Sequence, residues 1–344
     1  MRAVLYRRFR ETPRVENVPE PVVAGDAALV RVRATGVCRS DWHGWQGHDD
    51  DITLPHVPGH EFAGEVVAVG TDVRRWETGR RVTAPFVCAC GDCPECLAGD
   101  HQVCRRQEQP GFTYWGSFAD LVVVPRADVN LVRLPDDLAY DAAAGLGCRF
   151  TTSFRAVVHV GAVRAGEWLA VHGCGGVGLA AVAIGAAAGA RVIAVDVGAG
   201  ALELASALGA EVTIDASVAD SAAAVTDVTD GGAHVSLDAL GSPDTCVGSI
   251  RSLRRRGRHV QVGLLPPAAG RTDVPMDLVV ARELAVLGSH GMAAHHYREV
   301  LALVSRGVLD PGRLVRRHVS LEEAGDALAT MASSPGAGIT VVRP

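Results

Sequence analysis

The sequence lacks the features that would place a chain in or across a membrane. No run reaches the ~18 strongly apolar residues that a membrane-spanning helix needs. The most apolar stretch, Gly175 to Ala190, is rich in alanine and interrupted by glycines, which is typical of a buried helix. The N-terminal residues MRAVLYRRF become polar too early for a secretory signal peptide. We therefore expect a cytoplasmic protein that does not bind a membrane.

An excess of positive charge, internal repeats and low-complexity segments are also missing. The 33 Lys and Arg residues are outnumbered by 39 Asp and Glu residues, which gives a net charge of −6. A mildly acidic chain argues against nucleic acid or an anionic membrane surface as the main partner. The length of 344 residues predicts about two domains, each with enough apolar residues for a core.

Cysteine is present in an odd number, nine, and it is clustered. Without an export signal, clustered cysteines favour metal binding over disulfides. Four of them have the spacing C-x2-C-x2-C-x7-C, which lets one short lobe surround a zinc ion and leaves no coordination position for a substrate. The four cysteines with this spacing are Cys90, Cys93, Cys96 and Cys104, and we expect them to form a structural zinc site, although Cys88 adds a fifth thiol that makes the register ambiguous.

The pattern of predicted strands changes near residue 150. Before it, valine-rich runs separated by glycine and proline predict an irregular, largely antiparallel β-domain. From Trp168 onward, short apolar strands alternate with alanine-rich helices, which predicts an α/β fold with a parallel, doubly wound sheet.

Two local features follow in this part of the chain. The run Arg254 to Arg258 is interpreted as a solvated helix end. The alternation stops after Gly288, and Ser320 with Glu323 forms a capping box.

A glycine-rich turn follows the predicted strand Trp168 to His172 and precedes a predicted helix. Glycines at such a turn let a pyrophosphate approach backbone amides at the helix N-terminus, where the helix dipole favours an anion. The strand before it, the helix after it and an acid at the end of the next strand support this interpretation. The predicted nucleotide-binding residues of the turn are Gly173, Gly175, Gly176, Val177 and Gly178.

The acid at the end of that next strand is Asp196. A carboxylate there can accept hydrogen bonds from an adenosine ribose, but it would repel a 2′-phosphate. The residues that follow it, Val197 to Gly200, include no arginine that could hold such a phosphate. The sequence therefore predicts NAD(H) rather than NADP(H).

A second set of soft metal ligands is dispersed over three segments. Cys38 lies in GVCRSDWH, His60 in PGHEFAGEV and Cys148 in GLGCRF. Three protein ligands leave one tetrahedral position for water or substrate, as in a catalytic zinc site. Glu61, beside His60, could be a fourth ligand in some states.

Taken together, these motifs resemble the zinc-dependent medium-chain alcohol dehydrogenases along essentially the whole chain. The segments that carry the resemblance are GVCRSDWH, PGHEFAGEVVAVG, CGDCPEC with Cys104, GLGCRF and GCGGVG, in the order and approximate spacing of that family. The resemblance implies a GroES-like catalytic domain in residues 1–150 and 288–344, with a Rossmann domain inserted at residues 151–287. It also implies NAD(H), two zinc ions per chain, and a homodimer or homotetramer.

The resemblance assigns roles to further residues. Cys38, His60 and Cys148 correspond to the catalytic zinc ligands, and Glu61 to a nearby carboxylate that can exchange with water. Metal-bound imidazoles usually donate their other N–H to a carboxylate, and Asp41 resembles that partner of His60. The remaining positions that match the family are Ser40 and His43 for a proton relay, Arg39 for pyrophosphate, Thr152 and Val177 for the nicotinamide, and Phe86, Trp42 and Trp115 for the substrate pocket.

This reading predicts an enzyme that oxidises a primary or secondary alcohol reversibly to an aldehyde or ketone. A polyol, sugar or amino-alcohol dehydrogenase on the same scaffold is an alternative. Cys148 favours the alcohol dehydrogenase ligand set, because a glutamate often takes that place in polyol-type sites. A protein that binds zinc and nucleotide without catalysis is a second alternative, but it would not need an open metal position.

Overall fold

The chain folds into two units, and one of them is built from both ends of the sequence. The computed structural model describes residues 1–265, 270–332 and 336–344. Unit 1 comprises Met1–Thr151 and Gly291–Pro344, and unit 2 comprises Thr152–His290. Among the described residues, no helix is both long enough and apolar enough to cross a membrane.

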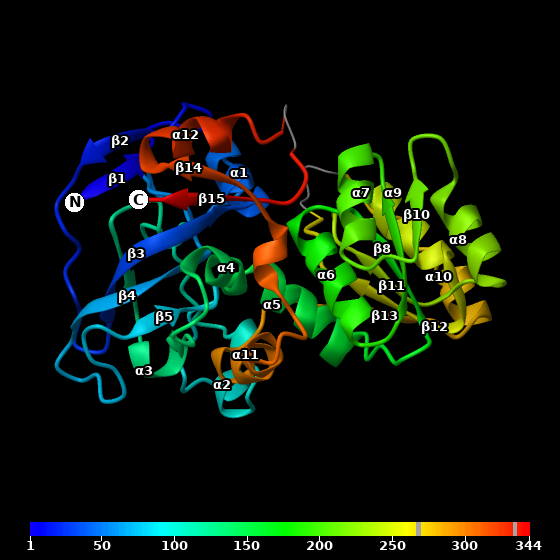
Figure 1. Cartoon of the computed structure of the whole chain (residues 1–344), viewed down its shortest axis with the longest axis horizontal. Coiled ribbons are helices and arrows are strands. Elements are labelled where there is room, and N and C mark those ends of the chain that lie inside the picture. The colour runs from blue at the N-terminus through cyan, green and yellow to red at the C-terminus, as the bar shows by residue number, and fades with distance from the viewer. Residues whose placement is uncertain (266–269, 333–335) are drawn as a thin grey trace. The chain divides into compact units, whose positions relative to one another are not determined.

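Unit 1 is organised by a seven-stranded sheet with the order β14-β15-β3-β4-β5-β7, and β6 also pairs with β3. The pairs are antiparallel except for β14 with β15. Figure 1 shows the C-terminal strand β15 in red beside β3 in blue, so strands from both ends of the sequence form one sheet. The strands of this sheet are β3 (Ala28–Val37), β4 (Phe62–Val69), β5 (Arg81–Thr83), β6 (Leu121–Val124), β7 (Val132–Arg133), β14 (Val315–Ser320) and β15 (Ile339–Arg343). Strands β1 (Arg2–Leu5) and β2 (Arg14–Asn17) form a separate antiparallel pair.

Helices of unit 1 pack against its strands, with α4 (Tyr140–Ala144) against β3 and β4 and α12 (Leu321–Ala329) against β14 and β15. Alternating side chains of β3, β4, β5 and β6 form one apolar core, which includes Val30, Phe62 and Val82. Helix α12 begins at a capping box in which Ser320 and Glu323 each bond the other's backbone N–H, as predicted. The helices are α1 (Arg39–Gln46), α2 (Pro94–Leu97), α3 (Ala127–Asn130), α4 (Tyr140–Ala144), α11 (Tyr297–Ser305) and α12 (Leu321–Ala329), and α5 (Arg149–Phe154) continues from unit 1 into unit 2.

Unit 2 is a parallel six-stranded sheet with the order β10-β9-β8-β11-β12-β13. The strand order reverses at β8, so the carboxyl end of β8 is the topological switch point at which ligands bind in such folds. The strands are β8 (Trp168–His172), β9 (Arg191–Asp196), β10 (Val212–Asp215), β11 (Ala233–Asp238), β12 (Leu253–Gln261) and β13 (Ala285–Gly288).

The helices of unit 2 connect consecutive strands. Crossovers between parallel strands are right-handed, so connections that run outward from β8 in opposite directions cover opposite faces of the sheet. Helix α6 contacts α7, and α8 contacts α9, in agreement with two separate helical layers (Figure 1). The helices are α6 (Gly176–Ala187), α7 (Ala199–Ala207), α8 (Ser221–Thr229), α9 (Pro243–Arg251) and α10 (Met276–Ala281). The predicted α/β fold with a doubly wound parallel sheet is confirmed.

One local prediction was wrong. The arginine run from Arg254 to Arg258 is not a helix end, because α9 ends at Arg251 and the run forms the first half of β12. The pairing of β12 with β11 has a bulge in this stretch, and Arg256 has a positive φ of 60°. The bulge leaves Arg254, Arg255 and Arg256 exposed, so long polar side chains are accommodated within a strand.

Burial of a histidine in the core of unit 2 makes the stability of the protein dependent on pH. His172, at the end of β8, is 1% exposed and shares a contact of 3.4 Å between its Nε2 and the Ser252 hydroxyl. Burial, and secondarily the neighbouring His259, lower the pKa of His172 to about 3. The unfolded chain therefore binds a proton near pH 6.5 that the folded chain does not, and stability falls as the pH drops below that value.

We predict that the change His172→Gln reduces this acid sensitivity. Between pH 7 and pH 5, the variant should lose about 2 kcal/mol less unfolding free energy than the wild type. The measurement is urea unfolding at several pH values, with His318→Gln, at an exposed position, as the control. Identical pH dependence of the wild type and His172→Gln would show that His172 does not contribute.

Candidate metal centres and nucleotide-binding turn

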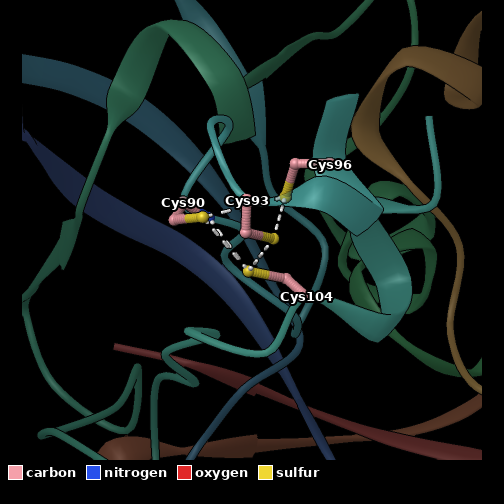
Figure 2. Close-up of side chains that lie close together, drawn as sticks. All are labelled: Cys90, Cys93, Cys96 and Cys104. Carbon is pink, nitrogen blue, oxygen red and sulfur yellow. Dashed lines mark hydrogen bonds between the residues drawn. The ribbon is translucent and has the colours of Figure 1, made fainter. Parts of the chain in front are cut away.

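The four predicted cysteines converge in one lobe of unit 1 (Figure 2). The Sγ atoms of neighbouring pairs lie 3.4 to 3.9 Å apart. Four thiolates bound tetrahedrally at about 2.3 Å from zinc have S···S separations of about 3.8 Å. The Cys104 sulfur also accepts the backbone N–H groups of Cys90 and Arg106, both at 3.4 Å. The residues present therefore fit a closed tetrathiolate zinc site.

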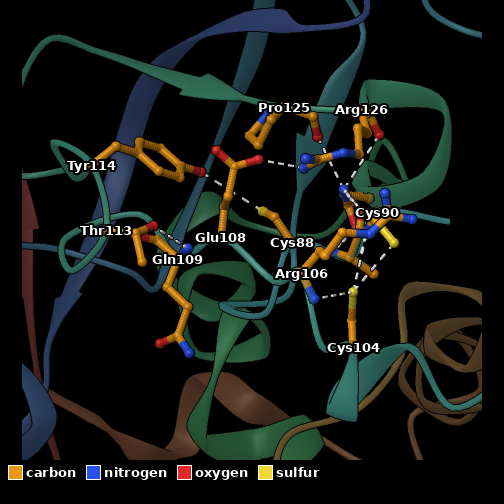
Figure 3. Close-up of polar contacts among 12 residues, drawn as sticks. Cys88, Cys90, Cys104, Arg106, Glu108, Gln109, Thr113, Tyr114, Pro125 and Arg126 are labelled. Carbon is orange, nitrogen blue, oxygen red and sulfur yellow. Dashed lines mark hydrogen bonds and ion pairs between the residues drawn. The ribbon is translucent and has the colours of Figure 1, made fainter. Parts of the chain in front are cut away.

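Cys88 lies outside this cluster, at the stem of the lobe. Its backbone pairs with Glu108 through bonds of 2.8 and 3.0 Å, which close the lobe at its base. Figure 3 shows its thiol directed toward Tyr114, whose hydroxyl lies 3.7 Å from Cys88 Sγ. Burial raises the pKa of Cys88 to about 12. The lobe is braced further by an ion pair between Arg126 and Glu108.

The second set of soft ligands also converges in unit 1. Cys38 is the N-cap of α1 directly after β3, His60 and Glu61 immediately precede β4, and Cys148 lies between a short 3₁₀ turn and α5. Adjacent antiparallel strands β3 and β4 bring the first three together, since Thr35 pairs with Phe62. One ligand atom from each of Cys38, His60, Glu61 and Cys148 lies within 4.8 Å of the others.

A buried carboxylate orders two of these ligands. Asp41 Oδ1 accepts the His60 Nδ1–H at 2.8 Å and the Gly59 N–H at 3.0 Å. Asp41 Oδ2 accepts the Cys38 N–H at 3.0 Å. Because Nδ1 carries the proton, Nε2 of His60 presents its lone pair to the site.

The His60 ring and the two thiols fit a metal ion. Among the described residues, His60 Nε2 is buried without a hydrogen-bond partner, which is costly unless a ligand uses it. Hydrogen bonding from Cys148, and the charges of Arg149 and His60, hold the pKa of Cys38 well below its ordinary value, so the thiolate is favoured. Burial lowers the pKa of His60, but the Asp41 carboxylate raises it, and the pKa lies well above its ordinary value. A metal ion at Nε2 would take the place of a proton on that nitrogen.

Sequence reasoning missed the partner of Glu61. Arg149 Nε donates to both carboxylate oxygens, at 3.0 and 2.9 Å, and Arg149 Nη1 donates to the Val37 carbonyl at 3.1 Å. Burial raises the pKa of Glu61 above its ordinary value, and Arg149 opposes that effect. The available signal was a single cation in the otherwise apolar and small-residue stretch from Ala142 to Phe150.

Aromatic side chains border His60. Phe86 lies edge-on with its ring centroid 6.1 Å from that of His60, and Phe112, which sequence reasoning missed, lies closer, at 5.3 Å. Trp42 and Trp115 pack against a core cluster of unit 1, and the Trp115 indole N–H donates to the Pro55 carbonyl at 3.0 Å. The structure therefore places Phe86 and Phe112 beside the candidate metal ligand.

The proposed relay residues lie on α1. Ser40 Oγ is 4.0 Å from the Cys38 sulfur. His43 Nδ1 lies 3.0 Å from His48 Nδ1, so one ring donates to the other. Burial, and then the charge of Arg39, lower the pKa of His43. The Arg39 guanidinium stacks over the Trp42 ring at 4.5 Å from its centroid.

In unit 2, the glycine-rich turn has the form that its sequence predicts. Gly173 has a φ of 91°, which favours glycine, and Gly175 caps the N-terminus of α6. A Cβ on Gly178 would lie 1.8 Å from the Gly173 carbonyl oxygen, whereas a Cβ on Gly175 would meet no atom within 4 Å. The open space at Gly175 and the first-turn amides of α6 fit a nucleotide pyrophosphate.

Asp196 lies at the end of β9 and braces this turn. Its two oxygens accept the Cys174 N–H at 2.5 Å and the Gly198 N–H at 2.8 Å. The hydroxyl of Thr152 is buried and has no partner among the described residues, and the neighbouring Ser153 hydroxyl donates to the Val177 carbonyl at 2.7 Å. These positions therefore offer polar atoms to a bound cofactor.

Two family models match the chain. Residues 24–136 match the alcohol dehydrogenase GroES-like domain, and residues 176–306 match the zinc-binding dehydrogenase domain.

Individual proteins are similar over nearly their whole length. An alcohol dehydrogenase of Geobacillus stearothermophilus is 33% identical over 311 residues, 89% of this chain and 90% of its own. An L-threonine 3-dehydrogenase of Streptomyces coelicolor is 32% identical over 336 residues, 93% of each chain. A crystal structure described as a zinc-binding dehydrogenase of Sinorhizobium meliloti bound to NADP has a TM-score of 0.88 and 31% identity, and covers 100% of this chain and 99% of that one.

The geometry of the cysteine lobe predicts different results for two neighbouring thiols. Cys93→Ser should lose one zinc ion per chain and unfold at a lower temperature, because three thiolates no longer close the site. Cys88→Ser, the matched control, should keep both zinc ions, because its thiol faces Tyr114. The measurements are metal analysis and thermal unfolding. Loss of turnover in a Cys93→Ser protein that keeps its stability and assembly would mean that the two metal sites have been assigned the wrong way round.

Proposed function

Since this chain belongs to the zinc-containing medium-chain alcohol dehydrogenase family, we propose that it transfers hydride reversibly between a primary or secondary alcohol and NAD. The family itself makes the protein a zinc-dependent NAD(P) oxidoreductase. The substrate class and the preference for NAD are the proposed parts, since similar proteins include alcohol and threonine dehydrogenases.

One observation carries the proposal. Among the described residues, His60 Nε2 is buried and unpartnered, beside the thiols of Cys38 and Cys148. Three such ligands with an open fourth coordination position are typical of a catalytic zinc site, whereas the tetrathiolate lobe has no open position. Asp41 supports this use of His60, because it fixes the tautomer that leaves Nε2 free to ligate.

Cys38, His60 and Cys148 would hold the catalytic zinc, which supplies Lewis acidity that favours the deprotonated alcohol and polarises a carbonyl. The nicotinamide of NAD supplies the hydride acceptor. The turn from Gly173 to Gly178 would bind the pyrophosphate through the first amides of α6, and Asp196 would bind the adenosine ribose. Arg39 is proposed to contact the pyrophosphate, and Thr152 and Val177 to orient the nicotinamide ring.

The side chains of α1 supply the exit for the substrate proton. We assign Ser40 the role of accepting that proton, since it lies two residues after Cys38 in the first turn of α1 and its hydroxyl is 4.0 Å from the Cys38 sulfur. His43 then receives it, and its contact of 3.0 Å with His48 offers a further step toward solvent. The lowered pKa of His43 lets it release a proton near neutral pH.

Two aromatic rings favour an apolar alcohol as the substrate. Phe86 and Phe112 border the His60 ring, and their apolar faces would exclude water from the reacting groups. A polyol, a sugar or an amino alcohol needs polar groups that satisfy its additional hydroxyl or amino groups. The aromatic border therefore supports a simple primary or secondary alcohol.

Removal and return of the metal tests the reaction class. We expect dialysis against a chelator to abolish NAD reduction by simple alcohols, and zinc to restore it. Aliphatic and aromatic alcohols should be better substrates than polyols or L-threonine. Cys38→Ser should retain the tetrathiolate zinc but lose turnover, which separates the two sites. The enzyme proposal fails if neither the metal-free nor the zinc-loaded protein moves hydride from any alcohol.

The cofactor preference depends on the charge of Asp196. We expect a higher kcat/KM with NAD than with NADP, and a ratio of the two that falls about tenfold or more in Asp196→Asn. Repulsion between like charges a few ångströms apart is worth roughly 1 to 4 kcal/mol. Loss of one amide contact in the variant affects both cofactors, so the ratio isolates the charge. A wild-type preference for NADP in steady-state kinetics would contradict the proposal.

A further inference from the structure

We propose that Arg149 is a positioning residue that holds the Glu61 carboxylate back from the metal position, and so keeps the fourth coordination position open. The inference rests on the proposed function only in requiring a metal ion at Cys38, His60 and Cys148. It concerns Glu61 because a carboxylate oxygen of that residue lies within 4.8 Å of each of the other ligand atoms. Glu61 is therefore near enough to compete for the position that a substrate needs.

The hydrogen bonds of Arg149 fix its own side chain and the Glu61 carboxylate in one arrangement. Its Nε donates to Oε1 and Oε2 of Glu61 at 3.0 and 2.9 Å, so neither oxygen is without a donor. Its Nη1 donates to the Val37 carbonyl at 3.1 Å, next to the ligand Cys38. The side chains of Arg149 and Glu61 are 7% and 0% exposed, so water does not weaken the pair.

The backbone of Glu61 is fixed independently of its side chain. Its carbonyl accepts the Gly36 N–H at 2.7 Å and the Thr35 hydroxyl at 3.1 Å. A change in what the carboxylate binds therefore requires rotation of the side chain alone. The Glu61 carboxylate can therefore bind either the metal ion or Arg149 while its backbone stays in place.

The surrounding residues leave room for the guanidinium. A Cβ on Gly36 would lie 2.5 Å from Arg149 Nη2 and 3.2 Å from Glu61 Cδ. Any larger residue at position 36 would displace one of the two partners. The absence of a side chain at Gly36 thus allows Arg149 to reach the carboxylate.

Charge balance explains why Arg149 determines whether Glu61 binds the metal ion. Two thiolates neutralise a zinc ion, so the Glu61 carboxylate is an additional buried negative charge that needs its own cation. Arg149 supplies that cation and donates hydrogen bonds at the same time. Without Arg149, the metal ion is the cation within reach of the carboxylate, and Glu61 would close the fourth position.

The test measures the open position directly, without turnover. The wild type, Arg149→Gln and the double variant Arg149→Gln with Glu61→Gln are loaded with Co²⁺, and imidazole is titrated while the visible absorption is recorded. Imidazole can bind only a metal ion with an open or exchangeable position, so the tetrathiolate ion does not respond. Arg33→Gln, which removes an exposed ion pair between Arg33 on β3 and Glu65 on β4, is the control.

We expect imidazole to bind Arg149→Gln at least about tenfold more weakly than the wild type, a loss within the range typical for partners of metal ligands. The double variant and Arg33→Gln should bind imidazole as the wild type does. Arg149→Lys should recover part of the affinity, because it keeps the cation. Equal imidazole affinities in the wild type and Arg149→Gln would overturn the role of Arg149.

Two further results keep the inference separable from the proposed function. Binding of one Co²⁺ per chain instead of two by the wild type would refute the catalytic metal site, and with it the proposed function. Two Co²⁺ ions without an imidazole response in the wild type would refute the inference, whereas the proposed function is tested separately by zinc-dependent alcohol oxidation. If Arg149→Gln does not fold, Gly36→Ala displaces the guanidinium instead, and the same weakening of imidazole binding is expected.

Discussion

The geometry of unit 1 around the candidate catalytic metal depends on the buried carboxylate of Asp41. Its oxygens accept N–H groups from Cys38, Gly59 and His60, at 2.8 to 3.0 Å. A buried carboxylate without such donors would be strongly unfavourable, so these contacts also fix the segments that carry the ligands. One interaction therefore joins the end of β3, the start of α1 and the loop before β4, and it orients the His60 ring toward the other ligands.

An acidic side chain also accepts backbone N–H groups in unit 2. Asp196 accepts the backbone amides of Cys174 and Gly198, and it thereby holds the glycine-rich turn against the end of β9. In both units a short acidic side chain, Asp41 in the first turn of α1 and Asp196 at the end of β9, accepts backbone N–H groups of segments outside the strands. The strands supply a rigid frame, and these carboxylates set the loops on which the proposed chemistry takes place. Arg149 adds a third element, since it determines what the Glu61 carboxylate binds.

Local spacing explains which features could be predicted from the sequence. The tetrathiolate lobe needs only one short segment, and the parallel sheet follows from the alternation of strands and helices, so both were predicted. Arg149 and Phe112 were missed because packing between segments far apart in the sequence brings them to Glu61 and His60. The arginine run of β12 was misread because a bulge places charged side chains in a strand. The proton relay, the substrate-pocket residues and the homodimer or homotetramer stay predictions.

The central claim is that one chain holds two metal centres of different kinds, one closed and one open. Anomalous diffraction at the zinc absorption edge, from crystals of the protein as purified, tests this directly. The account predicts two peaks per chain, one surrounded by Cys90, Cys93, Cys96 and Cys104, and one bonded to Cys38 Sγ, His60 Nε2 and Cys148 Sγ with a non-protein fourth ligand. A single peak at the cysteine lobe, or a second ion bonded to Glu61 in place of the non-protein ligand, would contradict it.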